Sequence, residues 1–353
     1  MIIAGKRGKV QPKGKKMDNT SVLVELWRGD VLESLHGGDA VICDASGAVI
    51  WAFGNPAKTI LPRSSCKMLQ ALPLIESGAA AARGLDARHL ALACASHSGE
   101  KFHVDLVTGW LSDIGLTETD LRCGAQWSED HDYHIELACS GRHEDQRHNN
   151  CSGKHTGFLT LTDHLKAGPE YIELDHPVQK AVKQACEEMC GEASPGYAVD
   201  GCSAPNFATT LKGLATAMAR MADPSGLSGV RRDAAARLTA AMAAHPELVA
   251  GTGRSETELM AAMRGPTALK HGAEGVYTAI LPQRGLGVAL KVADGANRAA
   301  EIAMAALLVR LGVADPDHPM VAKWLRPGLQ SRRGIPSGFM RPSEALFESG
   351  RRI

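Results

Sequence analysis

The residues best suited to chemistry are a serine and a lysine three positions apart, in the stretch Arg63-Ser64-Ser65-Cys66-Lys67. An apolar run with helical spacing follows, and residues i and i+3 of a helix lie on one face. A serine hydroxyl becomes a strong nucleophile when a base takes its proton, and a neutral lysine amine can be that base. The spacing therefore predicts a Ser64–Lys67 nucleophilic pair at the start of a helix, although so short a motif also arises by chance.

A second cluster of small polar residues, Ser96-His97-Ser98-Gly99-Glu100, stands between an apolar run and a predicted helix. Hydroxyl and N–H groups at such a junction are well placed to hold a carboxylate or an oxyanion. The alternative interpretation is ordinary helix capping by Ser96 or Ser98.

Two further clusters contain cysteine beside other reactive side chains: Asn149-Asn150-Cys151-Ser152-Gly153-Lys154-His155-Thr156-Gly157 and Asp200-Gly201-Cys202-Ser203-Ala204-Pro205. If the two thiols converge, they offer soft ligands to a zinc ion. Neither cysteine has a Cys-x-x-Cys partner, so two unrelated buried thiols are the alternative.

The fifth cluster, Lys270-His271-Gly272-Ala273-Glu274-Gly275, lies between two strand-like runs. Penicillin-recognising enzymes place a Lys-[Thr/Ser]-Gly strand opposite a Ser-x-x-Lys helix, and Lys270-x-Gly272 follows Ser64-x-x-Lys67 in the same order. The alternative is a hairpin with an exposed lysine.

In this order the five clusters resemble those of the class 3, Rhizobium-type L-asparaginases, over about residues 21–330. The resemblance implies a fold related to serine β-lactamases and serine-dependent glutaminases, and hydrolysis of L-asparagine to L-aspartate and ammonia. It implies catalytic roles for Ser64, Lys67, Ser96 and Lys270, and substrate binding by Arg63, His155, Asp200 and Glu274. It also implies zinc as a cofactor, bound by Cys151, Lys154 and Cys202 and not necessarily required for activity.

The mechanism expected from this resemblance is attack by Ser64 on the side-chain amide, with Lys67 as the base. A second lysine nearby disfavours the charge of the first, and Lys270 is expected to supply that effect and to orient Ser96. An acyl-enzyme then forms, and water releases aspartate. Ser96 remains an alternative nucleophile.

Two other functions remain open. One is a serine-dependent glutaminase or another amidohydrolase of the penicillin-recognising type, because one methylene in a substrate is worth only about 1–3 kcal/mol of discrimination. The other is a non-catalytic zinc- or thiol-sensing protein that uses the nine cysteines of the chain.

Hydrophobic patterning places strands near both ends of the chain and helices between them. Strands are expected at 21–27, 39–44, 48–53, 197–203, 267–271, 275–281 and 285–292. Helices are expected at 64–78, 100–114, 154–166, 176–190, 206–221, 226–244, 255–264 and 295–312, while 90–95 fits either. This order predicts an α/β fold of the α+β type, with a mainly antiparallel central sheet built from both chain ends and flanking helices.

The predicted organisation is a disordered basic leader at 1–16, one catalytic domain at 17–330, and a tail of loops and short helices at 331–353. The formal net charge of zero argues against a nucleic-acid partner or a membrane-surface role. No run of about 18 apolar residues predicts a membrane span. An odd number of cysteines without a signal sequence indicates reduced thiols and a cytoplasmic protein, and a homodimer is the default expectation.

Overall fold

The computed structural model describes residues 21–263 and 265–348, so the predicted leader lies outside the described residues. The main sheet has eight strands, in the spatial order β11-β12-β1-β2-β10-β9-β8, with β3 beside β2. Every pairing in it is antiparallel. Their bounds are β1 (Val22–Arg28), β2 (Val31–Asp44), β3 (Val49–Phe53), β8 (Ala268–Gly272), β9 (Val276–Leu281), β10 (Leu286–Val292), β11 (Gly328–Gln330) and β12 (Pro336–Pro342).

The sheet joins the two ends of the chain, as the sequence predicted. Strand β1 lies between β2 and β12, and β2 pairs with β10, so the two N-terminal strands lie side by side with C-terminal strands on either side of them. The β2–β3 hairpin and the β8–β9–β10 meander are also present where they were expected. The predicted α+β class with a mainly antiparallel sheet is therefore confirmed.

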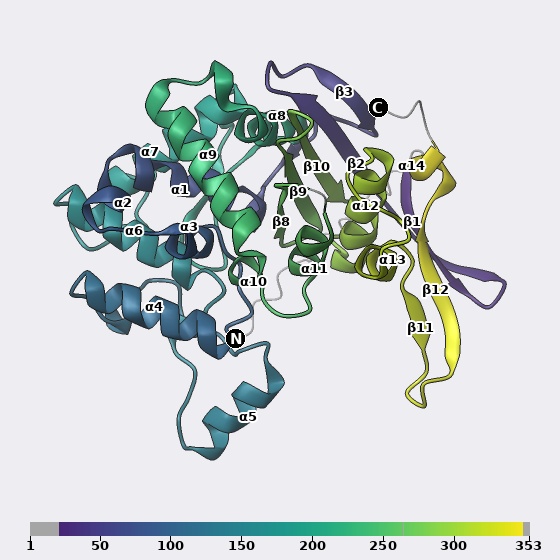
Figure 1. The fold of residues 1–353 in the computed structure, drawn as a ribbon, viewed down its shortest axis with the longest axis horizontal. Helices are drawn as coiled ribbons and strands as arrows, with labels where there is room; N and C mark the ends of the chain where they lie inside the picture. Colours follow the sequence, from purple (N-terminus) through teal and green to yellow (C-terminus); the bar gives the residue numbers. More distant parts are fainter. Residues whose placement is uncertain (1–20, 264, 349–353) are drawn as a thin grey trace, which may run out of the picture.

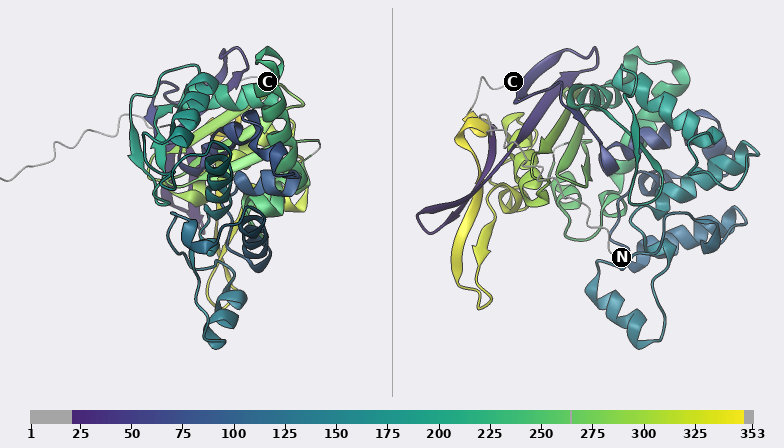
Figure 2. Two further views of the ribbon diagram at one scale, coloured as in Figure 1. Left: turned by 90° about the vertical axis from the view of Figure 1, so that its left-hand side faces the viewer. Right: turned by 180° about the vertical axis from the view of Figure 1, so that it is seen from behind.

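Helices occupy most of the chain between β3 and β8, and three further helices follow β10 in the described part of the chain. The helices are α1 (Lys67–Glu76), α2 (Ala79–Ala82), α3 (Ala87–Ala93), α4 (Lys101–Asp113), α5 (His131–Cys139), α6 (Ser152–His164), α7 (Pro177–Cys190), α8 (Leu211–Ala222), α9 (Gly229–Ala244), α10 (Pro246–Val249), α11 (Ser255–Ala262), α12 (Asn297–Arg310), α13 (Pro319–Leu325) and α14 (Glu344–Glu348). Figure 1 shows α1, α3, α6, α7 and α9 to one side of the sheet and α12 and α13 to the other, and Figure 2 shows the same arrangement from behind.

Two close packings position the helical layer. Helix α8 lies directly on β10, where a Cβ at Gly287 would come within 2.1 Å of the Ala219 nitrogen. Helix α1 packs among α6, α7 and α9 and is buried from Lys67 to Ile75. The helix that begins with the motif lysine is thus fixed inside the molecule.

Several sequence predictions of secondary structure need correction. The stretch from 313 onward, expected as loops and short helices, contains the paired strands β11 and β12. The two prolines of β12 stand at its ends, where proline is tolerated. The helix expected from 206 begins only at Leu211, after the short strands β6 (Pro205–Phe207) and β7 (Thr209–Thr210). For residues 90–95, where the sequence allowed a strand or a helix, the helix is correct up to Ala93, the last residue of α3. No helix in the described ranges is long and apolar enough to cross a membrane.

Candidate active site

Ser64 lies on a single 3-10 turn, η1 (Arg63–Cys66), which leads directly into α1. The helix begins three residues later than predicted, with Lys67 as its first residue. The Ser65 hydroxyl donates to the Pro62 carbonyl at 2.7 Å and so ties the turn to itself. Ser64 is partly exposed, and its hydroxyl makes no hydrogen bond with any described residue. The turn therefore presents Ser64 as a free hydroxyl.

Lys67 is buried and turns toward the second cluster. Its Nζ atom donates to the Ser96 Oγ at 2.9 Å, to the Asn150 carbonyl at 3.3 Å and to the Ala95 carbonyl. These three acceptors match the three N–H donors of an ammonium group. The serine that Lys67 contacts is therefore Ser96, whereas the sequence spacing predicted Ser64 as its partner.

Lys270 lies in the middle of β8 with no exposed surface. Its Nζ atom donates to the His271 carbonyl at 2.9 Å and lies 4.0 Å from the Glu256 Oε1. Burial lowers the pKa of Lys270 to about 7, an effect that Glu256 opposes and Lys67 reinforces. Near neutral pH a large fraction of this amine is therefore unprotonated.

Strand β8 lies against the turn that carries Ser64. A Cβ at Gly272 would come within 2.8 Å of the Pro62 carbonyl oxygen and 2.9 Å of the Ser65 nitrogen, so only glycine allows this approach. From β9, the Thr278 hydroxyl lies 3.0 Å from the Ser65 carbonyl oxygen and 3.1 Å from that of Lys270. The strand and the turn are thus held as one unit.

Arg63, directly before Ser64, has a backbone φ of +54°, which is unusual for any residue except glycine. Its Nε atom donates to the Asp200 Oδ1 at 2.7 Å, and its backbone N–H donates to the Asn206 side chain at 3.3 Å. Such strained residues persist where the surroundings hold them. The ion pair and the amide therefore fix the entry into the turn.

The two cysteines of the predicted metal site come together around Lys154. The Lys154 Nζ lies 3.1 Å from the Cys202 Sγ. A hydrogen bond from Cys151 and the charge of Lys154 hold the pKa of Cys202 well below its usual value, against the effect of burial. The hydrogen bond to Cys202, together with burial, raises the pKa of Cys151. Lys154 and Cys202 are thus in direct contact, and each favours the charged form of the other.

His155 borders this cluster as a neutral imidazole, because burial lowers its pKa to about 4. The Tyr171 hydroxyl accepts the Arg122 backbone N–H at 2.7 Å and lies 2.8 Å from the His155 Nδ1. The tyrosine proton is therefore free for Nδ1, which leaves the ring proton on Nε2. A hydrogen bond between His155 and Cys202 opposes the effect of burial on the pKa of the imidazole.

The arrangement fits a metal ion only in part. No group of three or more His, Cys, Asp or Glu residues within 21–263 and 265–348 is arranged to hold one. Cys151, Lys154 and Cys202 do offer two sulfur donors and one nitrogen donor, which suit zinc. Three protein donors leave the fourth position of a tetrahedral ion open.

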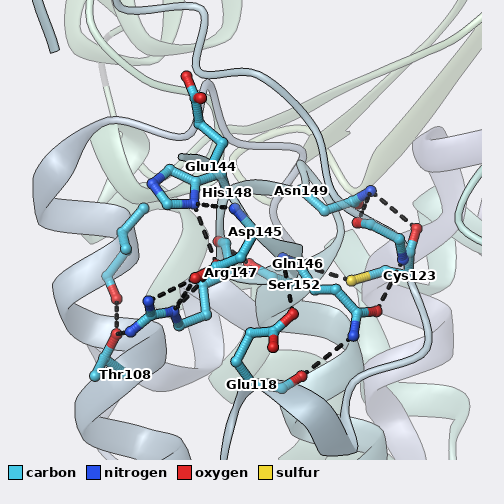
Figure 3. Close-up of polar contacts among 12 residues, drawn as sticks. Thr108, Glu118, Cys123, Glu144, Asp145, Gln146, Arg147, His148, Asn149 and Ser152 are labelled. Carbon is cyan, nitrogen blue, oxygen red and sulfur yellow. Dashed lines mark hydrogen bonds and ion pairs between the residues drawn. The ribbon is translucent and has the colours of Figure 1, made fainter. Parts of the chain in front are cut away.

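The loop that carries Asn150 and Cys151 is held by the polar network of Figure 3. The Asn149 side chain donates to the carbonyls of Cys123 and Gly124, each at 3.0 Å. The Ser152 hydroxyl donates to the Arg147 carbonyl at 2.8 Å and lies 2.9 Å from the His97 Nε2. His97 thus links the Ser96 loop to the start of α6.

Two residues of the sequence clusters lie apart from these contacts. Glu274 is exposed in the β8–β9 turn, with φ of +61°, and no hydrogen bond or ion pair among the described residues joins it to the other candidates. Cys66 lines an apolar pocket between α1 and α7 with Cys186 and Cys190. Burial raises the pKa of Cys66 to about 12, so it is an inert thiol.

Sequence reasoning missed four residues that contact the site: Asn150, Asn206, Glu256 and Thr278. Asn150 stands beside Cys151 in a recognised cluster and was therefore within reach of the sequence. Asn206 lay in a predicted helix, and Glu256 and Thr278 lay in an ordinary helix and strand pattern. Only the fold brings these three to the site.

Comparison with known proteins gives one family. A sequence model of the family described as L-asparaginase II matches residues 24–342. No curated protein matches the chain. Among solved structures, a β-lactamase from Mycobacterium bovis is 15% identical with a TM-score of 0.41, and the match covers 77% of this chain and 94% of that one.

A candidate β-lactamase from Bacteroides dorei is 11% identical with a TM-score of 0.39, covering 72% of this chain and 84% of that one. Both TM-scores are too low for any conclusion about this chain to be drawn from these two structures. The fold class rests on the strands and helices described above, and the family rests on the sequence match.

Proposed function

Because the chain belongs to the L-asparaginase II family, we propose that it hydrolyses L-asparagine to L-aspartate and ammonia by serine–lysine catalysis. The family supports an amidohydrolase of the asparaginase type. The observation that carries the finer proposal is the convergence of both motif lysines on one site. Lys67 binds Ser96, and Lys270 is buried close enough for the charge of Lys67 to lower its pKa. Ser64 lies on the turn against which the strand of Lys270 packs, and its hydroxyl bonds no described residue.

In the proposed reaction the Ser64 Oγ attacks the side-chain carbonyl carbon of asparagine, and its proton passes to a neutral lysine amine. The tetrahedral intermediate collapses to an acyl-enzyme as that proton leaves with the amide nitrogen as ammonia. A water molecule then attacks the ester, and aspartate and free Ser64 result. The backbone of β8, packed against the turn at Gly272, is the natural place for N–H donors to the oxyanion.

The hydrogen-bond partners of the two lysines indicate which of them is charged. The result differs from the prediction made from sequence spacing, in which Lys67 was the neutral base. Lys67 has three acceptors, as an ammonium requires, whereas Lys270 has one hydrogen-bond acceptor and a pKa of about 7. We therefore assign the neutral amine to Lys270 and the charged one to Lys67. In this assignment Lys67 orients Ser96 and disfavours the charge of Lys270.

The substrate's own charges have matching groups beside Ser64. Arg63 and Asp200 form an ion pair at the entry to the turn and remain partly exposed. A guanidinium suits the α-carboxylate of an amino acid, and a carboxylate suits its α-ammonium group. This pair supports an amino acid amide as the substrate.

A zinc ion is part of the proposal as a ligand of Cys151, Lys154 and Cys202. The contact between Lys154 and Cys202 and the low pKa of Cys202 support it. When bound, zinc would supply an electrophilic anchor for the substrate. The cluster's position next to Asn150, whose carbonyl accepts from Lys67, would place that anchor beside the lysine pair.

The test is ammonia release by the purified protein from L-asparagine, L-glutamine and a chromogenic β-lactam, with and without a chelator. We expect asparagine to be the best substrate, with some activity on glutamine because the two differ by one methylene. If kcat/KM were higher for glutamine or for the β-lactam than for asparagine, the asparaginase assignment would be wrong, and one of the alternative amidohydrolase functions would take its place. Absence of all three activities would leave the non-catalytic alternative.

A further inference from the structure

Behind Lys270 lies a buried carboxylate that the proposed mechanism does not use. Glu256 is the second residue of α11 and is only 1% exposed. Its Oε1 lies 4.0 Å from the Lys270 Nζ and accepts the His271 backbone N–H at 3.3 Å. The Ser255 hydroxyl donates to Oε2 at 3.2 Å. A carboxylate in the interior needs such partners, and two of the three come from the strand that carries Lys270.

The other elements packed around Glu256 also contribute titratable or charged groups. These are Lys270 and His271 from β8, Tyr277 from β9, Glu301 from α12 and Arg254 directly before α11. Burial alone would raise the pKa of Glu256, but Lys270, His271 and Arg254 together hold it below its usual value. Burial and the charge of Glu256 raise the pKa of Glu301 to about 7. Glu256 is therefore the ionised member of this carboxyl pair.

Opposite effects act on the pKa of Lys270. Glu256 favours its protonated form, while burial and the charges of Lys67 and Arg254 favour its neutral form. A general base has to accept a proton and then release it, and it works best when both states are accessible near the working pH. Without a counter-charge, a fully buried amine would be held neutral and would be a weak base.

We propose that Glu256 is a positioning residue of this site: its carboxylate fixes the Lys270 amine beside the nucleophile turn and allows that buried amine to accept the serine proton. The proposal rests on the proposed function for its catalytic meaning. The claim that Glu256 controls the protonation of Lys270 does not depend on which reaction the site catalyses.

The first test is the pH profile of kcat/KM for Glu256→Gln, which keeps the shape of the side chain and removes its charge. Activity that needs neutral Lys270 is lost as pH falls through its pKa. Loss of the counter-charge lowers that pKa, so the acid limb should move to lower pH by about one unit or more. The plateau kcat should fall by roughly tenfold or more, because a base of lower pKa is weaker. KM should change little.

Two variants serve as controls. Glu258→Gln lies on the same helix but binds Lys323 and Trp324, so its pH profile should match that of the wild type. Glu301→Gln removes a second titratable group near Glu256, a carboxyl whose pKa burial and the charge of Glu256 raise to about 7. The acid limb should persist in Glu301→Gln; its disappearance would assign the limb to Glu301 and overturn the proposal, as would an acid limb that stays in place in Glu256→Gln.

The second test needs no substrate. Protein labelled with ¹³C at lysine Cε is titrated by NMR, and the Lys270 signal is identified by its absence in Lys270→Met. In Glu256→Gln its midpoint should fall by about one unit or more. An equal or higher midpoint would overturn the proposal. If the midpoint falls but the wild type releases no ammonia from asparagine, the proposed function fails and the control of Lys270 by Glu256 stands.

Glu256→Asp keeps the charge at a greater distance and covers the case in which Glu256→Gln does not fold. Its Lys270 midpoint should lie below that of the wild type and, when Glu256→Gln is measurable, above that of the glutamine variant. A midpoint equal to or above the wild-type value would again overturn the proposal.

Discussion

The Nζ atom of Lys67 lies 2.9 Å from the Oγ atom of Ser96, and this hydrogen bond joins two sequence clusters that are 29 residues apart. It ties the first residue of α1 to the loop that follows α3. Ser64, three residues before Lys67, is left with a free hydroxyl. The site is therefore assembled by tertiary packing, although its first serine and lysine are neighbours in sequence.

The Lys67–Ser96 contact predicts coupling between two substitutions. Lys67→Met and Ser96→Ala should each lower kcat by about a hundredfold or more, since each removes part of one unit, and the double variant should cost far less than the product. Ammonia release measured for all four proteins gives the coupling. Lys101→Met, which removes an exposed lysine of α4, should leave kcat unchanged. Fully multiplicative effects would show that Lys67 and Ser96 act separately.

Lys270 predicts the pH dependence of the wild type. Its pKa of about 7 means that the neutral amine increases as pH rises through that value, so kcat/KM should rise there and level off above it. Lys270→Met should remove this limb and lower activity at neutral pH by about a hundredfold or more. Lys166→Met, at an exposed position, is the control. A wild-type limb retained in Lys270→Met would assign the titration to another group.

Thr278 predicts a combined effect on stability and activity. Thr278→Val removes the hydroxyl between the Ser65 and Lys270 carbonyls and should lower the free energy of unfolding by about 1–3 kcal/mol. Denaturant unfolding measures this loss, and kcat should fall as well because β8 and the turn are no longer joined. Thr162→Val is a matched control, since its hydroxyl bonds only a carbonyl of its own helix. Equal losses in both variants would remove the special role of Thr278.

The proposed zinc ligands predict metal content. Cys151→Ser and Cys202→Ser should each lower bound zinc measured by elemental analysis, and Lys154→Ala should lower it less, because thiolates are the stronger ligands. Zinc affinity should rise with pH, since Cys151 and Lys154 must lose protons to bind. Cys139→Ser, at an exposed cysteine, should change nothing. Unchanged zinc content in both cysteine variants would show that Cys151 and Cys202 are ordinary buried thiols and do not bind zinc.

Local patterns predicted the central sheet, the hairpin and the meander because alternating apolar residues and turn residues are short-range signals. The same holds for the clusters around Ser64, Ser96 and Cys151, which stand where helices begin, and for Lys270, which lies within a strand of the predicted meander. The strand β12 was missed because the prolines and scattered basic residues of the segment after 313 resemble a loop. Its pairing with β1 depends on a partner more than 300 residues away in sequence.

The charges of the site were less predictable than its members. Spacing on a helix suggested that Lys67 serves Ser64, but the helix begins at Lys67 itself and Ser64 remains on the preceding turn. Whether each lysine is charged depends on burial and on partners such as Glu256 and Asn150, which no local pattern marks. The sequence therefore identified the two lysines, but it could not show which of them is protonated.

Ammonia release from L-asparagine by Ser64→Ala, measured beside the wild type in one preparation, tests the central claim most directly. The hydroxyl of Ser64 makes no hydrogen bond to any described residue, so the variant should fold normally by circular dichroism. An essential nucleophile is worth orders of magnitude, and turnover should fall below about a thousandth of the wild-type rate. A folded Ser64→Ala protein that keeps more than about a tenth of wild-type turnover would contradict the assignment of Ser64 as the nucleophile.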